Sequence, residues 1–194
     1  MKKLYFDTST DVMYIVLAFN NKIVEINKYL GKRDHATFLV HRIDQILKKN
    51  NVTLGDISEI IVGEGPGSYT GIRVSATVAK TLCYAKNISL NAVSSLVFLT
   101  SGYKGKIIAL HDARRSHVFA CIYDRDQVLM KSQYMSIDDV KNQSNFEHTL
   151  PVYVHENHDS IDIEIIDAHK YKIKDLHRFE PNYARITEAE TNAS

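Results

Sequence analysis

The stretch of the chain best suited to chemistry is GEGPGSYTGIR at residues 63–73, which holds four of the eight glycines. Glycine-rich turns of this kind can place backbone N–H groups at the start of a helix, where an anion such as phosphate is attracted. Here those groups would belong to residues 68–71. Phosphate binding is therefore the first hypothesis that the sequence raises.

The spacing of the glycines argues against phosphate binding. A P-loop requires a lysine and then serine or threonine after its last glycine, whereas Ile72 and Arg73 follow here, and the dinucleotide fingerprint would close one residue earlier. The nearest lysine, Lys80, lies more than two helical turns away. We therefore favour a structural crossover, in which the last glycine lets a helix press onto a sheet. This structural loop comprises Gly65, Pro66, Gly67, Ser68 and Gly71.

Histidines offer a second kind of site. His148, His155 and His158 fall within EHTLPVYVHENH. A helical zinc pair requires an i,i+4 spacing and a third ligand, whereas His155 and His158 are three residues apart. We expect these histidines to lie on the surface and to bind no metal.

The segment HDARRSH contains fragments that resemble catalytic pairs. His111–Asp112 and Ser116–His117 come without an oxyanion loop or a third partner, so we expect no catalytic residue here. Arg114 and Arg115 in the same turn are the candidate contacts for the phosphates of a nucleic acid. A solvated face is the simpler interpretation, because no stacking aromatic residues interleave the basic ones in the sequence.

The composition is that of an ordinary globular protein. The 194 residues are 44% hydrophobic and 24% charged with a net charge of +1, which permits one large core or two small ones and disfavours a general polyanion binder. The N-terminal stretch predicts neither a signal peptide nor a membrane span, so we expect a cytoplasmic protein. Cys83 and Cys121 are expected to be reduced core residues.

The elements that position these groups begin with an antiparallel meander. Apolar patterns predict strands at 3–7 and 12–19 and a third strand after Asn20–Asn21, a pair typical of a two-residue hairpin turn. An amphipathic helix follows over residues 34–49, with Asp34 as its N-cap. Its predicted core face comprises Ala36, Leu39, Val40, Ile43, Ile46 and Leu47.

A strand–helix–strand segment completes the first unit. ISEIIVGEG predicts a buried strand, the glycine loop leads into a helix over 69–86 that Asn87 ends, and SLNAV predicts the next strand. We therefore assign residues 1–98 to an N-terminal α/β domain with a mixed sheet.

A second unit repeats the opening pattern. KIIALHD, HVFACIYD and VLMKSQYM predict three strands, Ser136 and Asp139 predict a capping box, and VYVHE and IEIIDA predict two more strands. We assign residues 99–180 to this smaller domain, and we expect residues 181–194 to be partly disordered.

The helix over 69–86 is apolar on more than one side. One side carries Ile72, Ala76, Ala79 and Cys83. The adjacent side carries Val74, Val78, Leu82 and Ala85. The combined arc spans roughly 200°, against about 100° for a helix covered on one side, so the helix needs a second cover from a neighbouring helix or a partner chain. Phe38, on the polar arc of the preceding helix, either meets the same partner or packs under a nearby loop.

Four segments in order along the chain resemble the bacterial TsaB (YeaZ) family. They are LYFDTST, GEGPGSYTGIRVSATVAKTLCYAKNISLNAVSSL, KIIALHDARRSHVF and PNYAR. The resemblance implies the fold of the actin-like ATPase superfamily, with two ribonuclease-H-like domains built on mixed sheets. This implication agrees with the order of elements predicted above.

The resemblance also implies a function. TsaB proteins take part in making threonylcarbamoyladenosine next to the anticodon of tRNA. They are the non-catalytic partners of the related subunit TsaD, which binds metal and nucleotide and transfers the threonylcarbamoyl group, and the ATPase TsaE joins the two. The resemblance therefore implies that ATP and metal belong to the partner subunits, that this chain binds no cofactor alone, and that it reaches tRNA through the complex.

Within the family, helices of the N-terminal domain pack against TsaD or a second TsaB. Such a partner would supply the second cover that the helix over 69–86 requires. The expected partner interface comprises Phe38, Arg42, Gln45, Tyr69, Ile72, Arg73, Ala76, Val78, Ala79, Leu82 and Cys83. Arg114 and Arg115 become the candidate tRNA contacts.

The chain departs from its catalytic relative at one informative place. Where TsaD carries a histidine pair for its metal, residues 94–98 read SSLVF and offer no such ligands. The second domain is also shorter than is usual in the family. The leading hypothesis is therefore a scaffold and activator without catalytic residues, and the alternatives are a freestanding ATP-dependent enzyme or peptidase and an interaction module without a tRNA role.

Overall fold

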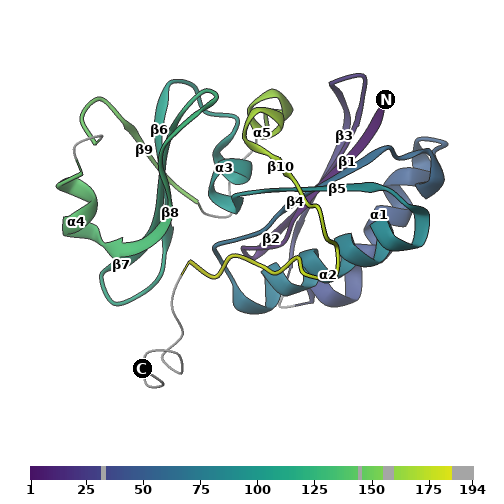
Figure 1. Ribbon diagram of the computed structural model, residues 1–194, viewed down its shortest axis with the longest axis horizontal. Helices are drawn as coiled ribbons and strands as arrows, with labels where there is room; N and C mark the ends of the chain where they lie inside the picture. Colours follow the sequence, from purple (N-terminus) through teal and green to yellow (C-terminus); the bar gives the residue numbers. More distant parts are fainter. Residues whose placement is uncertain (32–33, 144–145, 155–159, 185–194) are drawn as a thin grey trace.

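The computed structural model describes residues 1–31, 34–143, 146–154 and 160–184. It is an α/β structure with two mixed sheets that stand side by side, with two short helices between them (Figure 1). The fold class predicted from the sequence is confirmed. None of the described helices is both long and apolar enough to cross a membrane.

The first sheet has six strands in the order β10-β5-β4-β1-β2-β3. They are β1 (Lys2–Asp7), β2 (Val12–Phe19), β3 (Lys22–Leu30), β4 (Glu59–Gly63), β5 (Ser89–Val93) and β10 (Tyr171–Lys172). Strands β1 to β3 form the predicted antiparallel meander, while β4 and β5 run parallel to β1. Asn20 and Asn21 take φ values of 50° and 60° in the β2–β3 turn, as the hairpin prediction requires.

Helices α1 (His35–Lys49) and α2 (Tyr69–Lys86) cover one face of this sheet (Figure 1). A 3₁₀ turn (Leu54–Asp56) follows α1. Asn87 ends α2 in the left-handed conformation, as predicted. Asp34 is the N-cap residue of α1, as predicted, but its side chain makes no capping hydrogen bond, and its carboxylate accepts from the Tyr29 hydroxyl at 2.8 Å.

The core between α1, α2 and the sheet is apolar. Its buried members include Leu4, Phe6, Ile15, Leu39 and Ile43. The predicted core face of α1 is wrong at two positions, Ala36 and Val40, which are exposed, while His35 is buried. Cys83 is fully buried and free, and burial raises the pKa of its thiol to about 12, in agreement with the expected reduced core residue.

The second sheet has the order β8-β7-β6-β9. Its strands are β6 (Lys106–Asp112), β7 (His117–Asp124), β8 (Gln127–Ser136) and β9 (Leu150–Tyr153). The order repeats β3-β2-β1-β4 of the first sheet, which is the duplication that the sequence suggested. Helix α4 (Ile137–Lys141) follows β8, and the Ser136 hydroxyl caps it by accepting from the Asp139 amide at 3.0 Å.

Helices α3 (Ser95–Thr100) and α5 (Ile163–His169) lie between the two sheets (Figure 1). They share one apolar cluster with the facing residues of both sheets, including Tyr5 and Val16 on one side and Ala109 and Tyr123 on the other. The prediction of a strand at IEIIDA is wrong, because Asp162 caps a helix there by accepting from the Glu164 amide at 2.9 Å.

Residues after α5 return to the first sheet. Strand β10 pairs with β5, and the segment over 173–184 then runs along α2 (Figure 1). Phe179 is buried in the core under α2, and Lys80 of that helix donates to the carbonyls of His177 and Phe179 at 3.0 Å each. We call residues 171–184 the C-terminal strap. The assignment of 99–180 to the second domain is therefore wrong at its end.

The strap also bears on the expected disorder of the tail. The Asn182 amide donates to the Glu64 carbonyl at 2.8 Å, and the ring of Tyr183 stacks on Tyr69 with a centroid distance of 5.2 Å. Residues 181–184 are thus held on the first unit. The rest of that prediction falls on residues 185–194, which lie outside the described part of the chain.

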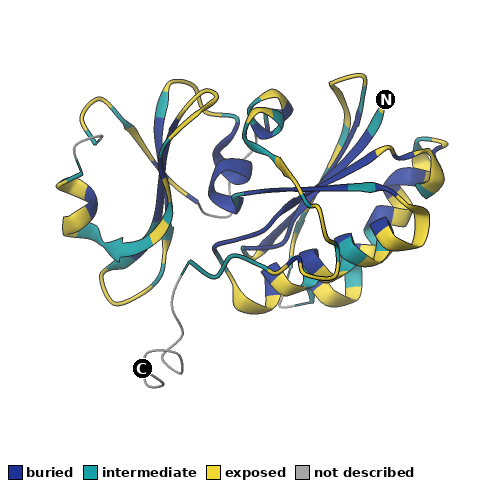
Figure 2. Ribbon diagram, in the orientation of Figure 1, coloured by how far each residue is buried: buried dark blue, intermediate teal, exposed yellow. Residues whose placement is uncertain are grey.

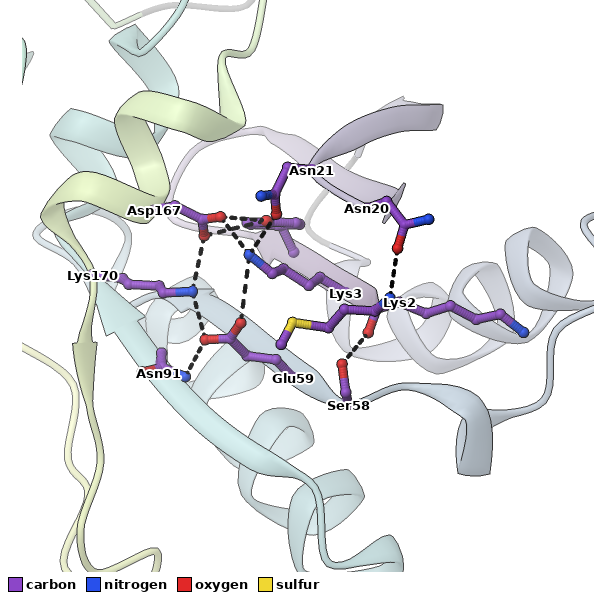
Figure 3. A network of polar contacts seen from close by, with 11 residues as sticks. Lys2, Lys3, Asn20, Asn21, Ser58, Glu59, Asn91, Asp167 and Lys170 are labelled. Atoms are coloured by element: carbon purple, nitrogen blue, oxygen red, sulfur yellow. Dashed lines mark hydrogen bonds and ion pairs between the residues drawn. The ribbon is translucent and has the colours of Figure 1, made fainter.

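A cluster of charged side chains ties α5 to the first sheet (Figure 3). The carboxylate of Asp167 in α5 forms ion pairs with the ammonium groups of Lys3 in β1, at 2.6 Å, and of Lys170, at 3.0 Å. Lys170 also lies 2.6 Å from Glu59 of β4, whose carboxylate accepts from Asn91 at 2.6 Å. We call Lys3, Glu59, Asp167 and Lys170 the charge cluster. Its two cations and two anions are mutually paired at the amino ends of β1 and β4.

Candidate functional site

The glycine loop brings the start of α2 against the end of β1. A Cβ at Gly71 would overlap the carbonyl oxygen of Thr8, and the Thr8 hydroxyl donates to the Gly71 carbonyl at 2.8 Å. The Ser68 amide donates to the Ser9 carbonyl at 2.7 Å. These contacts support the structural interpretation of the loop, since only a residue without a side chain fits at the crossover.

The other end of the loop is closed by the strap. Gly65 takes φ of 110° beside a cis bond to Pro66, and a Cβ on Gly65 would overlap the Asn182 carbonyl. The Gly65 amide donates to the Ser95 hydroxyl at 2.9 Å. The space next to Gly65 and Pro66 is therefore filled by the chain itself, whereas Gly67 and Ser68 border a cleft described below.

Asp7 is a carboxylate that lies beside the start of this segment, next to Gly63, and it is buried inside the structure. It is fully buried and accepts from the Ser9 amide at 2.8 Å, from the Ser9 hydroxyl at 2.7 Å and from Ser95. Burial raises the pKa of Asp7, against the opposing effect of these hydrogen bonds. Its oxygens accept hydrogen bonds from Ser9 and Ser95, so the carboxylate holds the chain in a tight turn where β1 ends.

Residues 94–98 do not fit the metal site of the catalytic relative. Ser95, Leu96, Val97 and Phe98 belong to α3 and are buried, the three apolar ones in the cluster between the sheets. The Ser95 hydroxyl is occupied by Asp7. The side chains here are those of a packing helix, and none is an imidazole or carboxylate.

Among the described residues, no group of three or more His, Cys, Asp or Glu side chains is arranged so that it could hold a metal ion. His148 lies in a turn with φ of 60°. His155 and His158 lie outside the described residues.

The expected partner interface divides into two groups of residues. Four of them face the sheet and are buried within the chain: Ile72, Ala76, Ala79 and Cys83. These four cannot contact a partner, so this part of the expectation is wrong. Val74, Val78 and Leu82 are half-buried and pack against the core of their own chain, whereas Tyr69 and Arg73 are exposed.

The expected interface residues of α1 are also mixed. Phe38 is half-buried and packs edge-on against Tyr29 of β3, with ring centroids 5.6 Å apart. Arg42 places its guanidinium 3.8 Å from the centre of the same ring and donates to Asn27 at 3.2 Å. Phe38 and Arg42 are therefore engaged by β3 of their own chain, whereas Gln45 is exposed.

A shallow apolar groove of about 440 Å³ lies between the start of α1 and the outer side of α2. It is lined by Ala36, Tyr69, Thr70, Arg73, Val74, Thr77 and Val78. Val40 continues the apolar surface along α1 and is 51% exposed. The outer faces of both helices are exposed along their length (Figure 2). Sequence reasoning missed Ala36 and Val40 as surface residues because it placed both on the core face.

A second and larger cavity of about 920 Å³ lies at the carboxyl ends of β1 and β6, between the two sheets. Its walls include Ser9, Thr10, Ser68, Tyr69, His111 and Arg114. We call it the cleft. Asp11 and Asp112 also border it. Burial lowers the pKa of His111, against the opposing effect of these two carboxylates, so the ring is neutral at neutral pH.

The hairpin over residues 112–116 carries the two candidate phosphate contacts. Arg114 and Arg115 are exposed and take φ values of 66° and 53°. The Asp112 carboxylate accepts from the Arg114 amide at 2.8 Å, and the His117 amide donates to the Arg114 carbonyl at 3.1 Å. The backbone of the hairpin is thus fixed by hydrogen bonds while both guanidinium groups remain on the surface.

Comparisons with solved structures agree with this architecture. A Pseudomonas aeruginosa protein described as similar to peptidase YEAZ superposes with a TM-score of 0.76 at 20% identity, covering 95% of this chain and 99% of that one. YeaZ from the same organism superposes with a TM-score of 0.66 at 20% identity, covering 86% and 89%. At this level of identity the likeness establishes a shared fold.

Sequence comparisons identify the family. A family model described as TsaD, tRNA N6-adenosine threonylcarbamoyltransferase, matches residues 22–163, which is more than half of the chain. The TsaB protein of Bacillus subtilis is 34% identical over 68% of this chain, and that of Escherichia coli is 30% identical over 66%. The match spans 58% and 57% of the length of these two relatives. The chain belongs to the threonylcarbamoyltransferase family of that model, in its TsaB (YeaZ) group.

Proposed function

We propose that this protein is a non-catalytic subunit in the synthesis of threonylcarbamoyladenosine in tRNA, and that it acts by docking the catalytic subunit TsaD. The curated relatives are named for this biosynthesis. The observation that carries the proposal is the apolar groove between α1 and α2, because this surface is left open by the described chain.

The chemistry of the groove favours a helical protein partner. Val74 and Val78 of α2 line the groove together with Ala36 of α1, and the exposed Val40 follows one turn later on α1, so small apolar side chains of two adjacent helices border the open surface. Small and β-branched residues allow another helix to approach closely. TsaD, being related to this chain, is expected to offer an equivalent pair of helices. TsaE then joins the pair of subunits.

We further propose that ATP and metal are bound by the partner subunits and not by this chain alone. Two observations support this proposal. The Asp7 carboxylate already accepts hydrogen bonds from Ser9 and Ser95, and residues 95–98 belong to a buried helix, α3. Calorimetric titration of the purified chain with ATP and magnesium is expected to show no binding. Saturable heat with turnover would favour a freestanding enzyme instead.

The docking proposal is tested by placing a charge in the groove. Val78→Glu should abolish co-purification with TsaD, because a carboxylate would be buried in an apolar interface without a partner. Val128→Glu is the matched control, since Val128 is 47% exposed on β8 of the other sheet. Size-exclusion chromatography with mass analysis reads out the complex, and circular dichroism checks the fold.

Retention of TsaD by Val78→Glu would show that the groove is not the docking surface. A self-association that Val78→Glu also breaks would show that a second copy of this chain can occupy the same groove. The effect on the pathway is read separately, from the threonylcarbamoyladenosine content of total tRNA in cells that carry each variant. Unchanged content after deletion of the protein would contradict the proposed role.

A further inference from the structure

A row of ring side chains crosses three strands of the second sheet. His111 of β6 lies opposite Phe119 of β7, and Phe119 lies opposite Tyr134 of β8. The ring centroids are 6.3 Å apart in the first pair and 5.8 Å apart in the second. His117 stacks on Tyr134 at 4.8 Å with an interplanar angle of only 7°. We call these four residues the ring row.

The ring row lies at the end of the sheet face that α3 and α5 do not cover. Farther along β7, Cys121 and Tyr123 are buried in the cluster with α3 and α5. The four members of the ring row are half-buried, and His111 and Phe119 line the cleft. The end of β8 that leads into α4 is coloured as half-buried in Figure 2. The rings are therefore held in place by one another while part of their surface remains accessible.

Positive charge lies directly beside the row. The hairpin with Arg114 and Arg115 joins β6 to β7, and the His117 ring that stacks on Tyr134 bonds through Nδ1 to the Arg115 carbonyl at 2.8 Å. Arg114, Arg115 and Ser116 take φ values of 66°, 53° and 59°, so three successive residues are left-handed. Such strained backbone persists where the surrounding structure holds it, and it is frequent at binding sites.

We propose that the ring row and this hairpin bind an unpaired segment of RNA directly. A nucleobase stacks on the exposed faces of His117 and Tyr134, while Arg114 and Arg115 contact the adjoining phosphates. Sheets that recognise single-stranded RNA use the same combination of surface rings and flanking cations. This inference rests on the proposed function, in which tRNA is the substrate, and it adds a contact made by this chain itself.

The charges in the cleft favour RNA over a free nucleoside triphosphate. Asp11 and Asp112 border the cleft beside His111, so a compact cluster of three phosphates would meet like charges there. An RNA strand carries one charge per phosphate and can place its phosphates on the outer hairpin. The Asp112 carboxylate is itself turned to the Arg114 amide.

The test uses fluorescence anisotropy with a labelled RNA stem-loop of the tRNA anticodon-arm sequence and a blunt duplex of the same stem. The purified chain should bind the stem-loop more tightly than the duplex. Tyr134→Leu, which keeps bulk but removes the ring, should weaken binding of the stem-loop about tenfold, while Tyr134→Phe should retain it. Replacing Arg114 and Arg115 with glutamine should lower the slope of log affinity against log salt by about 1.4.

Two controls lie in the same sheet. Tyr153→Leu removes a tyrosine that is 47% exposed on β9, on the opposite face of the sheet from the row, and Arg125→Gln removes an exposed cation from the β7–β8 turn. Neither should change the affinity. Circular dichroism and thermal melts of each variant confirm that the fold is kept.

The proposal would be overturned by no measurable binding by the unmodified chain, by equal losses of affinity in Tyr134→Leu and Tyr153→Leu, or by a preference for the duplex. Displacement of the stem-loop by stoichiometric ATP would also overturn it, in favour of a free nucleotide. Val78→Glu should bind the stem-loop normally. A failure of RNA binding is therefore distinguishable from a failure of the docking proposal, which that variant tests.

Discussion

The ammonium group of Lys3, on the first strand of the chain, lies 2.6 Å from the carboxylate of Asp167, 164 residues later in α5. Both side chains are largely buried, with exposed fractions of 8% and 20%. The pair belongs to the charge cluster at the amino ends of β1 and β4, whereas the cleft opens at the carboxyl ends. This ion pair therefore links α5, which lies between the two sheets, to the first sheet.

Replacing Lys3 with methionine should lower the free energy of unfolding by about 3 kcal/mol, because two carboxylates are then left with Lys170 as their remaining cation in the charge cluster. Urea denaturation measures the change. Lys48→Met is the control: its partner Asp44 lies 2.7 Å away, but both side chains are at least 50% exposed. That loss should stay below about 1 kcal/mol. If both variants lost the same free energy of unfolding, the buried ion pair would contribute no more to stability than the exposed one.

Tyr171→Phe should destabilise the protein in a pH-dependent way. The Tyr171 phenol donates to the Glu64 carboxylate, which is buried. Burial raises the pKa of Glu64, and the hydrogen bond partly offsets that rise. Removing the donor raises the pKa in the folded state further. The stability that depends on protonated Glu64 is present below its unfolded pKa and is lost as pH rises through the folded pKa.

The deficit of Tyr171→Phe should therefore be small near pH 4 and should reach about 2 kcal/mol near pH 8. Denaturation at several pH values measures it. Tyr84→Phe, at a position on α2 that is 72% exposed, should show no such trend. A deficit for Tyr171→Phe that is constant from pH 4 to pH 8 would mean that the titration of Glu64 is not involved.

Gly71→Ala tests the crossover. The added methyl group would overlap the Thr8 carbonyl oxygen, which belongs to the backbone and cannot move without shifting β1 or α2. We expect a loss of more than about 2 kcal/mol in thermal or urea unfolding. Gly55→Ala is the control, because its nearest neighbour, the Thr53 hydroxyl, would be in ordinary contact at 3.7 Å. A neutral Gly71→Ala would show that the helix does not press on the strand as described.

Phe179→Ala tests the C-terminal strap. Phe179 is 6% exposed within the core under α2, so truncation should lower the free energy of unfolding by about 3 kcal/mol. Val128→Ala removes an apolar side chain that is 47% exposed and should be nearly neutral. A neutral Phe179→Ala would mean that the strap contributes little to the first core.

Local sequence patterns predicted most of the regular elements. The Asn20–Asn21 pair predicted the meander turn because asparagine tolerates positive φ. The bounds of α2 were predicted because the glycine loop leads into the helix and Asn87 is a typical residue for its end, whereas the Ser68 cap was not predicted. The same reasoning failed at α5. Its run of isoleucines satisfies a strand pattern, and the deciding interactions, the Asp162 cap and the contacts with α3, are partly tertiary.

The candidate sites were predicted less well, for geometrical reasons. The wide apolar arc of α2 predicted that the helix is packed on two sides, but it did not predict which side packs on the sheet. Four residues were therefore assigned to a partner interface although they are buried against the sheet of their own chain: Ile72, Ala76, Ala79 and Cys83. The ring row depends on the register between β6, β7 and β8, which places Phe119 beside Tyr134. Those residues are too far apart in the sequence for a local pattern to join them.

The return of the strap to the first sheet has a consequence for biosynthesis. Ribosomes release the meander, α1 and α2 early, yet β10 and Phe179, which complete the edge and underside of that unit, emerge after the whole second sheet. The half that is translated first is the half that is finished last. Until those final segments arrive, the nascent first unit has an unpaired edge on β5 and lacks the Phe179 ring from its core.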